Sequence, residues 1–213
     1  MRNKRNSTKM FEILSSHINN NKKEYTVVII LFLIGIIIGI ILINHANQAQ
    51  EEQIKGYINS FISNIKENNN IDKVMLIKQS IKSNIMLAIL LWFAGMSVIG
   101  MPIVYGTVAF RGFCLSYTVS AIIATVGISK GIILSLSAMF LQSIILFPIV
   151  FALAVSGMKL YGSIMKDRRK ENIKIEIYRH TMLSAIMCVG LAISSIIEVY
   201  ISSNLVIFIS GWM

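Results

Sequence analysis

The chain has 213 residues, of which 55% are hydrophobic and only 14% carry a charge. A soluble domain of this length exposes far more charge, so the composition excludes that class and indicates an integral membrane protein in contact with membrane lipid. The net charge of +10 would suit nucleic acid. However, the basic residues flank apolar stretches and have no interleaved aromatic residues, so we expect no nucleic-acid partner.

The first predicted membrane span covers residues 27–43 and follows a basic N-terminal segment, 1–26. Its sequence, VVIILFLIGIIIGIILI, has no charge, and about 17 to 25 such residues cross the hydrocarbon core of a bilayer. The preceding segment is long and no A-x-A cleavage site follows, so we interpret the span as an uncleaved signal anchor. Gly35 and Gly39 have the G-x-x-x-G spacing of closely packed helices, which favours self-association or docking on another helix.

Residues 44–84 are predicted to form a long connection on the outer side of the membrane. Apolar residues recur in it at three- and four-residue spacing, which predicts an amphipathic helix. The stripe of this helix contains Ile54, Ile58, Phe61 and Ile65. Two compatible interpretations remain open: the helix lies on the lipid surface, or its stripe docks a partner protein. Asp72 is predicted to cap a second helix that leads into the next span.

Three further spans are predicted to form a bundle over residues 85–158. They cover 85–108, 113–128 and 132–157. Arg111 and Gly112 are predicted to form the tight turn between the first two, and a turn that contains Lys130 is predicted to join the last two.

Two prolines are predicted to lie inside spans of this bundle. Pro102 falls in the first of the three and Pro148 in the last. A proline in a membrane helix removes a backbone hydrogen bond, so we expect a kink at each position.

A basic loop at 159–180 precedes the fifth span, which together with an outer tail covers 181–213. Most of the 20 Lys and Arg fall in this loop and in residues 1–26. Because cytoplasmic loops carry an excess of Lys and Arg, we expect a cytoplasmic N-terminus and an extracytoplasmic C-terminus. The predicted fold is all-α: a polytopic membrane protein with about five transmembrane helices and an amphipathic helical outer loop.

The sequence contains none of the spacing motifs that hold a catalytic zinc, a phosphate, a dinucleotide or a serine nucleophile. Cys114 and Cys188 lie in apolar segments, where they are predicted to be packing residues. The three histidines, His180 among them, are scattered outside the predicted spans. We therefore expect no enzyme activity, no catalytic residue, no metal and no cofactor.

Two polar residues inside predicted spans are functional candidates. Glu198 is the only acidic residue in a span and lies near its outer end, where it either pairs with Lys130 or contacts headgroups and water. Gln142 is predicted first to hydrogen-bond a neighbouring helix and second to contact a ligand. A permease-type subunit with Gln142 and Glu198 on a transport path is therefore the alternative function.

The segment 92–117, WFAGMSVIGMPIVYGTVAFRGFCLSY, contains a Gly-x-Pro step in an aromatic-rich span, and then a basic residue with glycine that opens a helix. These residues are Gly100-Met101-Pro102 and Arg111-Gly112, followed by Tyr117-Thr118. They resemble the stage II sporulation protein M family of endospore-forming bacteria, and the layout of the whole chain is similar to that family.

A polar step and a later proline in the fourth span, Gln142 and Pro148, also fit the family. The chain departs from the pattern at Ser116, where glycine is common, and at Leu141 and Ser143 around the glutamine.

The resemblance implies a non-enzymatic protein of the mother-cell septal membrane, needed for septal peptidoglycan remodelling and for engulfment of the forespore. It also implies that the partners are the peptidoglycan-degrading stage II sporulation proteins D and P. The Asn-, Ile- and Lys-rich composition suits a low-GC Firmicute. The predicted function is thus a membrane scaffold that recruits or anchors these proteins through two faces, the stripe of the outer loop and the Gly35/Gly39 face.

Overall fold

The computed structural model describes residues 19, 21–67, 73–97, 99–166 and 170–210; the side chains of some helical residues, among them Ile65 and Gln142, lie outside this description. The described part of the chain is helical and contains no strand, which confirms the all-α prediction. Its helices are α2 (Lys22–Asn44), α3 (Gln48–Glu67), α4 (Lys73–Met96), α5 (Gly100–Val126), α6 (Ile128–Lys166) and α7 (Lys170–Ser210).

Five of these helices have segments long and apolar enough to cross a membrane, as predicted. The segments are Lys22–Asn44, Val74–Met96, Gly100–Val126, Ser143–Met165 and Ile173–Ile201. Helix α3 is the exception, and it begins with a reciprocal cap. The Asn47 side chain accepts a hydrogen bond from the Gln50 N–H at 2.9 Å, and the Gln50 side chain accepts one from the Asn47 N–H at 3.1 Å.

The predicted second span, 85–108, is not one helix, because α4 ends at Met96 and α5 begins at Gly100. A tight turn joins the two helices, in which the Gly100 N–H donates to the Ser97 carbonyl at 3.0 Å. A Cβ at Gly100 would collide with the Ala94 carbonyl oxygen, so the turn requires glycine there. Pro102 consequently lies in the first turn of α5, where the missing N–H is harmless, rather than at a kink inside a span.

The predicted turn at Arg111 and Gly112 is also wrong, because both residues lie inside the uninterrupted helix α5. A charged residue next to glycine is typical of a loop, but here Gly112 serves close packing: a Cβ at this position would collide with the Phe32 carbonyl oxygen of α2. The next turn, predicted to contain Lys130, lies instead at Gly127, whose positive φ of 92° is tolerated by glycine. Lys130 therefore lies in the first turn of α6.

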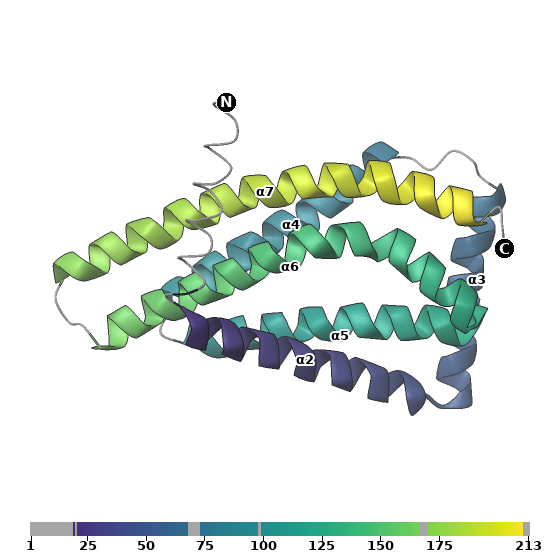
Figure 1. Cartoon of the computed structure of the whole chain (residues 1–213), viewed down its shortest axis with the longest axis horizontal. Coiled ribbons are helices and arrows are strands. Elements are labelled where there is room, and N and C mark those ends of the chain that lie inside the picture. The colour runs from purple at the N-terminus through teal and green to yellow at the C-terminus, as the bar shows by residue number, and fades with distance from the viewer. Residues whose placement is uncertain (1–18, 20, 68–72, 98, 167–169, 211–213) are drawn as a thin grey trace.

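Figure 1 shows the long helices α2, α4, α5, α6 and α7 running lengthwise and α3 crossing one end of the bundle. That end, which also holds the Gly127 turn, is called the α3 end. The other end, called the basic end, holds the α4–α5 turn and the starts of α2 and α7, with Lys22, Lys23 and Lys174. Helix α6 packs against α4, α5 and α7, and α2 packs mainly against α5.

Helix α6 has 39 residues and contains Pro148, as predicted. Figure 1 shows this helix bent along its length, and a proline within a helix is a usual cause of such a bend. The segment after the proline supplies much of the core. Leu153, Ala154 and Val155 are fully buried there, together with Leu91 of α4 and Leu191 of α7.

Candidate functional site

The stripe of α3 divides between the bundle and the surface. Ile58 is buried and Ile54 half-buried, so these residues hold the helix against the bundle. Phe61 and Tyr57 are exposed, at 50% and 78%. The side chain of Ile65 lies outside the described part. The amphipathic pattern thus provides both an attachment and a free aromatic surface.

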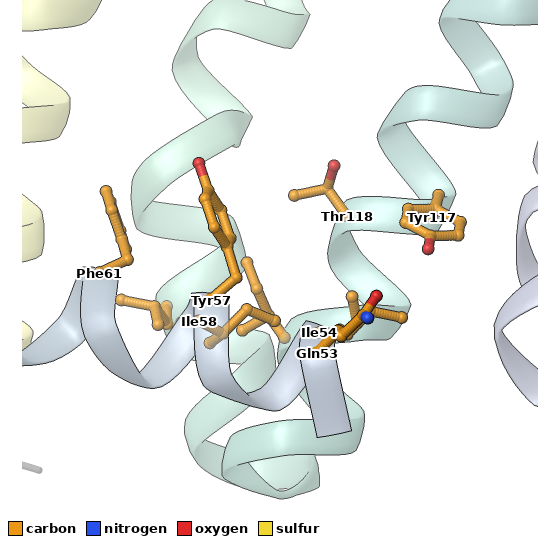
Figure 2. Close-up of a pocket in the computed structure, with 10 residues that line it drawn as sticks. Gln53, Ile54, Tyr57, Ile58, Phe61, Tyr117 and Thr118 are labelled. Atoms are coloured by element: carbon orange, nitrogen blue, oxygen red, sulfur yellow. The ribbon is translucent and has the colours of Figure 1, made fainter. Parts of the chain in front are cut away.

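Between α3 and the bundle lies an apolar groove of about 400 Å³, called the α3 groove. Figure 2 shows side chains of α3 facing those of α5 across it. Its α3 wall includes Ile54, Tyr57 and Phe61, and its other walls come from α5 and from Leu134 of α6. Such a groove binds apolar groups, either a hydrocarbon chain or the apolar face of a peptide helix.

The Gly35/Gly39 face, predicted to dock a partner, is occupied within the molecule. Both glycines are buried against α5. A Cβ at Gly35 would collide with the Ala109 carbonyl oxygen, and one at Gly39 with the Ser116 side chain. The prediction that this face receives another protein is corrected: the small residues allow α2 to approach the α5 backbone of the same chain.

Glu198 and a nearby asparagine join α7 to α4. The Ser80 hydroxyl donates to the Glu198 carboxylate at 2.9 Å, and the Asn84 side-chain amide donates to the Ser195 hydroxyl at 2.8 Å. The two ion pairs between described residues, Lys55–Glu51 and Arg179–Glu176, do not include Lys130. Glu198 is therefore an interhelical contact in this structure.

The structure adds no support for the permease alternative from Gln142, the other polar residue of the predicted transport path. Gln142 lies within α6, but its side chain is outside the described part.

His180 was missed by the sequence analysis, which placed it in a loop. The structure places it in α7, only 1% exposed, with Nδ1 2.9 Å from the Ser156 hydroxyl of α6 and Nε2 3.3 Å from the Trp92 carbonyl oxygen of α4. The imidazole therefore links three helices near the basic end. The three- and four-residue spacing of polar and small residues from His180 through Ser184 to Glu198 is the signal that identifies this face of α7.

Arg111 also lies elsewhere than predicted: it was expected in a turn, but it lies in the membrane-spanning part of α5. A charge at the centre of a membrane helix costs about 2.5–3.5 kcal/mol on insertion scales. Its side chain is half-buried and borders two grooves, one of about 580 Å³ with α4 and one of about 100 Å³ with α6. Neither of the ion pairs between described residues involves it.

The described residues contain no group of three His, Cys, Asp or Glu side chains placed to hold a metal ion. Cys114 in α5 and Cys188 in α7 are free thiols, both half-buried.

Comparison with known proteins agrees with the layout of the helices. The model of the family "Stage II sporulation protein M" matches residues 28–203, which covers the described helices from α2 into the last part of α7. No curated protein and no solved structure gives a significant match. The match extends over most of the chain, and the chain therefore belongs to the stage II sporulation protein M family.

Proposed function

We propose that this protein is a non-enzymatic membrane scaffold that holds peptidoglycan-degrading proteins at the sporulation septum for septal thinning and engulfment. The membership in the stage II sporulation protein M family supports a role in sporulation. The single structural observation that supports a scaffold is the α3 groove with its exposed aromatic rim, Tyr57 and Phe61. The expected partners, from the family resemblance, are the stage II sporulation proteins D and P.

The proposed orientation places the basic end in the cytoplasm and the α3 end outside. Most of the 20 Lys and Arg fall in residues 1–26 and 159–180, and the described parts of these two segments, with Lys22 and Lys174, lie toward the basic end of the bundle. Cytoplasmic segments of membrane proteins carry such an excess of basic residues. With this orientation α3 and its groove face the compartment that contains peptidoglycan.

Docking on α3 would use the residues that the bundle leaves exposed. Exposed aromatic side chains next to an apolar cavity are the usual anchors of a protein interface, because they bury a large area when a partner covers them. Ile58, which is already buried, would keep α3 in place while a partner contacts Tyr57 and Phe61.

Retention of the hydrolases in sporulating membranes tests this proposal. Phe61→Glu places a charge on the rim of the α3 groove, and Asn59→Glu places the same charge on the exposed opposite face of α3. We expect Phe61→Glu to lower co-purification of the peptidoglycan-degrading proteins with the tagged full-length protein about tenfold, and Asn59→Glu to leave it unchanged. Equal retention by wild type and Phe61→Glu contradicts docking on α3.

A further inference from the structure

Arg111 lies within the hydrocarbon core when α5 spans the membrane. The helix runs from Gly100 to Val126, so Arg111 is about 16 Å along the axis from its start and about 22 Å from its end. The hydrocarbon core is about 30 Å thick. Lys and Arg near helix ends extend their side chains to the headgroups, but Arg111 is far from both ends.

A polar stripe on α5 surrounds the guanidinium. Thr107, Arg111, Cys114 and Thr118 follow one another at spacings of three and four residues, so they share one face of the helix. The two threonine hydroxyls donate to carbonyls of their own helix, Thr107 to Ile103 at 2.7 Å and Thr118 to Cys114 at 2.8 Å. Arg111 is the charged member of this stripe, and neither of the ion pairs between described residues includes it.

The guanidinium borders an open groove that is wide enough for bulky side chains. This groove, the α4–α5 groove, has a volume of about 580 Å³ and is lined only from α4 and α5, which diverge from their common turn (Figure 1). Exposed apolar residues form its edges: Met86 and Leu90 on α4, and Ile103 and Phe110 on α5. An apolar groove with one cation at membrane depth is complementary to an apolar helix that carries one anion.

The described part of the chain pairs no carboxylate with Arg111. Among the described acidic residues of the long helices, Glu24 and Glu176 lie toward the basic end, and Glu198 contacts Ser80 of α4, about one helical turn beyond Ser83 of the α4–α5 groove. Glu176 already pairs with Arg179 and Glu198 with Ser80. A second copy offers only these same carboxylates, and its Glu198 is held between α7 and α4 by Ser80, so a different protein is the better source of the anion.

We infer that the α4–α5 groove receives a membrane-spanning helix of a different protein, whose Asp or Glu side chain pairs with Arg111 in the membrane. This inference rests on the proposed function, because it names the kind of contact by which the scaffold holds a membrane-anchored partner. The two grooves contact different parts of the partner: the α4–α5 groove holds its membrane helix, and the α3 groove contacts its segment outside the membrane.

Site-specific photocrosslinking of the full-length protein in sporulating cells tests the inference. A benzoylphenylalanine replaces Ile103 in the groove, and a second one replaces Ile37 of α2, which is 56% exposed and lines none of the grooves described above, as the lipid-facing control. We expect a protein adduct at Ile103 whose crosslinked peptide is a membrane-spanning segment with an Asp or Glu, and lipid adducts alone at Ile37.

Changing the charge at position 111 tests whether Arg111 forms the ion pair with the partner's carboxylate. Arg111→Leu should lower the protein adduct about tenfold, whereas Thr107→Val, in the same groove, should leave it within about twofold of wild type. Because leucine inserts into a membrane more readily than arginine, the loss is not a failure of insertion. Arg111→Glu should abolish the adduct, and changing the partner's carboxylate to Arg should restore it.

Three results overturn the inference: only lipid adducts at Ile103, a crosslinked segment without a carboxylate, or an adduct that survives Arg111→Leu. Hydrolase retention is scored in the same membranes. If wild type retains the hydrolases and Arg111→Leu leaves the adduct intact, the inference fails while the proposed function stands. If wild type retains none of them, the proposed function itself fails.

Discussion

The α2–α5 and α4–α7 interfaces both join apolar helices, but they do so through different contacts. The first is backbone against backbone: Gly35 and Gly39 of α2 lie on α5, and Gly112 of α5 lies on α2. The second uses side-chain hydrogen bonds, from Ser80 to Glu198 and from Asn84 to Ser195. Glycine packing depends on steric fit and fails abruptly when an atom is added, whereas a hydrogen-bonded interface loses one contact at a time.

The largest effect is expected from Gly35→Leu. The Cβ would collide with the Ala109 carbonyl oxygen, which is backbone and cannot rotate away. We expect a loss of about 3 kcal/mol or more, seen as little monodisperse protein after detergent extraction. Gly162→Leu is the control, because a Cβ there meets nothing within 4 Å. Normal yield of Gly35→Leu would show that α2 does not pack on α5 as described.

The next largest effect is expected from His180→Ala, near the basic end of the α4–α7 interface. The change removes a buried ring and leaves the Ser156 hydroxyl without its partner at 2.9 Å. A buried polar group that loses its partner costs about 1–3 kcal/mol, so thermal unfolding in detergent should shift down by several degrees. Tyr178→Ala, two residues away and 67% exposed, is the control. An unchanged midpoint for His180→Ala would contradict the three-helix link.

A smaller coupling is expected between Asn84 and Ser195. A double-mutant cycle with Asn84→Ala and Ser195→Ala isolates the 2.8 Å hydrogen bond between them. Interhelical hydrogen bonds in membrane proteins contribute about 0.6 kcal/mol on average, so we expect a coupling of that size in the free energy of unfolding. Additive single-mutant effects would mean that packing rather than this hydrogen bond joins the helices.

Glu198→Gln is expected to have the smallest effect. A glutamine amide oxygen still accepts the hydrogen bond from Ser80, so stability should change by less than about 0.5 kcal/mol. Spore formation and hydrolase retention should both stay normal. Loss of spore formation with normal retention would instead favour the transport alternative.

Sequence reasoning predicted which segments cross the membrane better than where they turn. Long apolar runs and the α3 stripe depend only on local composition and periodicity, and the structure has these helices. The turn between α4 and α5 was misplaced because Arg111-Gly112 is typical of a loop, while the true turn at Ser97–Gly100 contains no charge. Charge marks a loop only where the fold does not bring the charged residue into the bundle.

Among the candidate site residues, periodicity grouped Ile54, Ile58 and Phe61, and all three line the α3 groove. Gly35 and Gly39 were recognised as packing residues, but not which helix they contact, because one G-x-x-x-G motif suits any close partner. His180 was missed because the start of the fifth span was placed one residue after it.

The sequence by itself determined the class of this protein: apolar segments long enough for a bilayer, an amphipathic α3, and basic residues concentrated in two segments, 1–26 and 159–180. Hydrophobic burial and the positive-inside bias are properties of composition, so they can be read without coordinates. The tertiary structure decided which small and polar residues meet. It placed Gly35 on Ala109, His180 between Ser156 and Trp92, and Arg111 beside an open groove in the membrane. Such contacts join residues far apart in the chain, and helices of similar apolar composition can pair in many ways until close packing selects one.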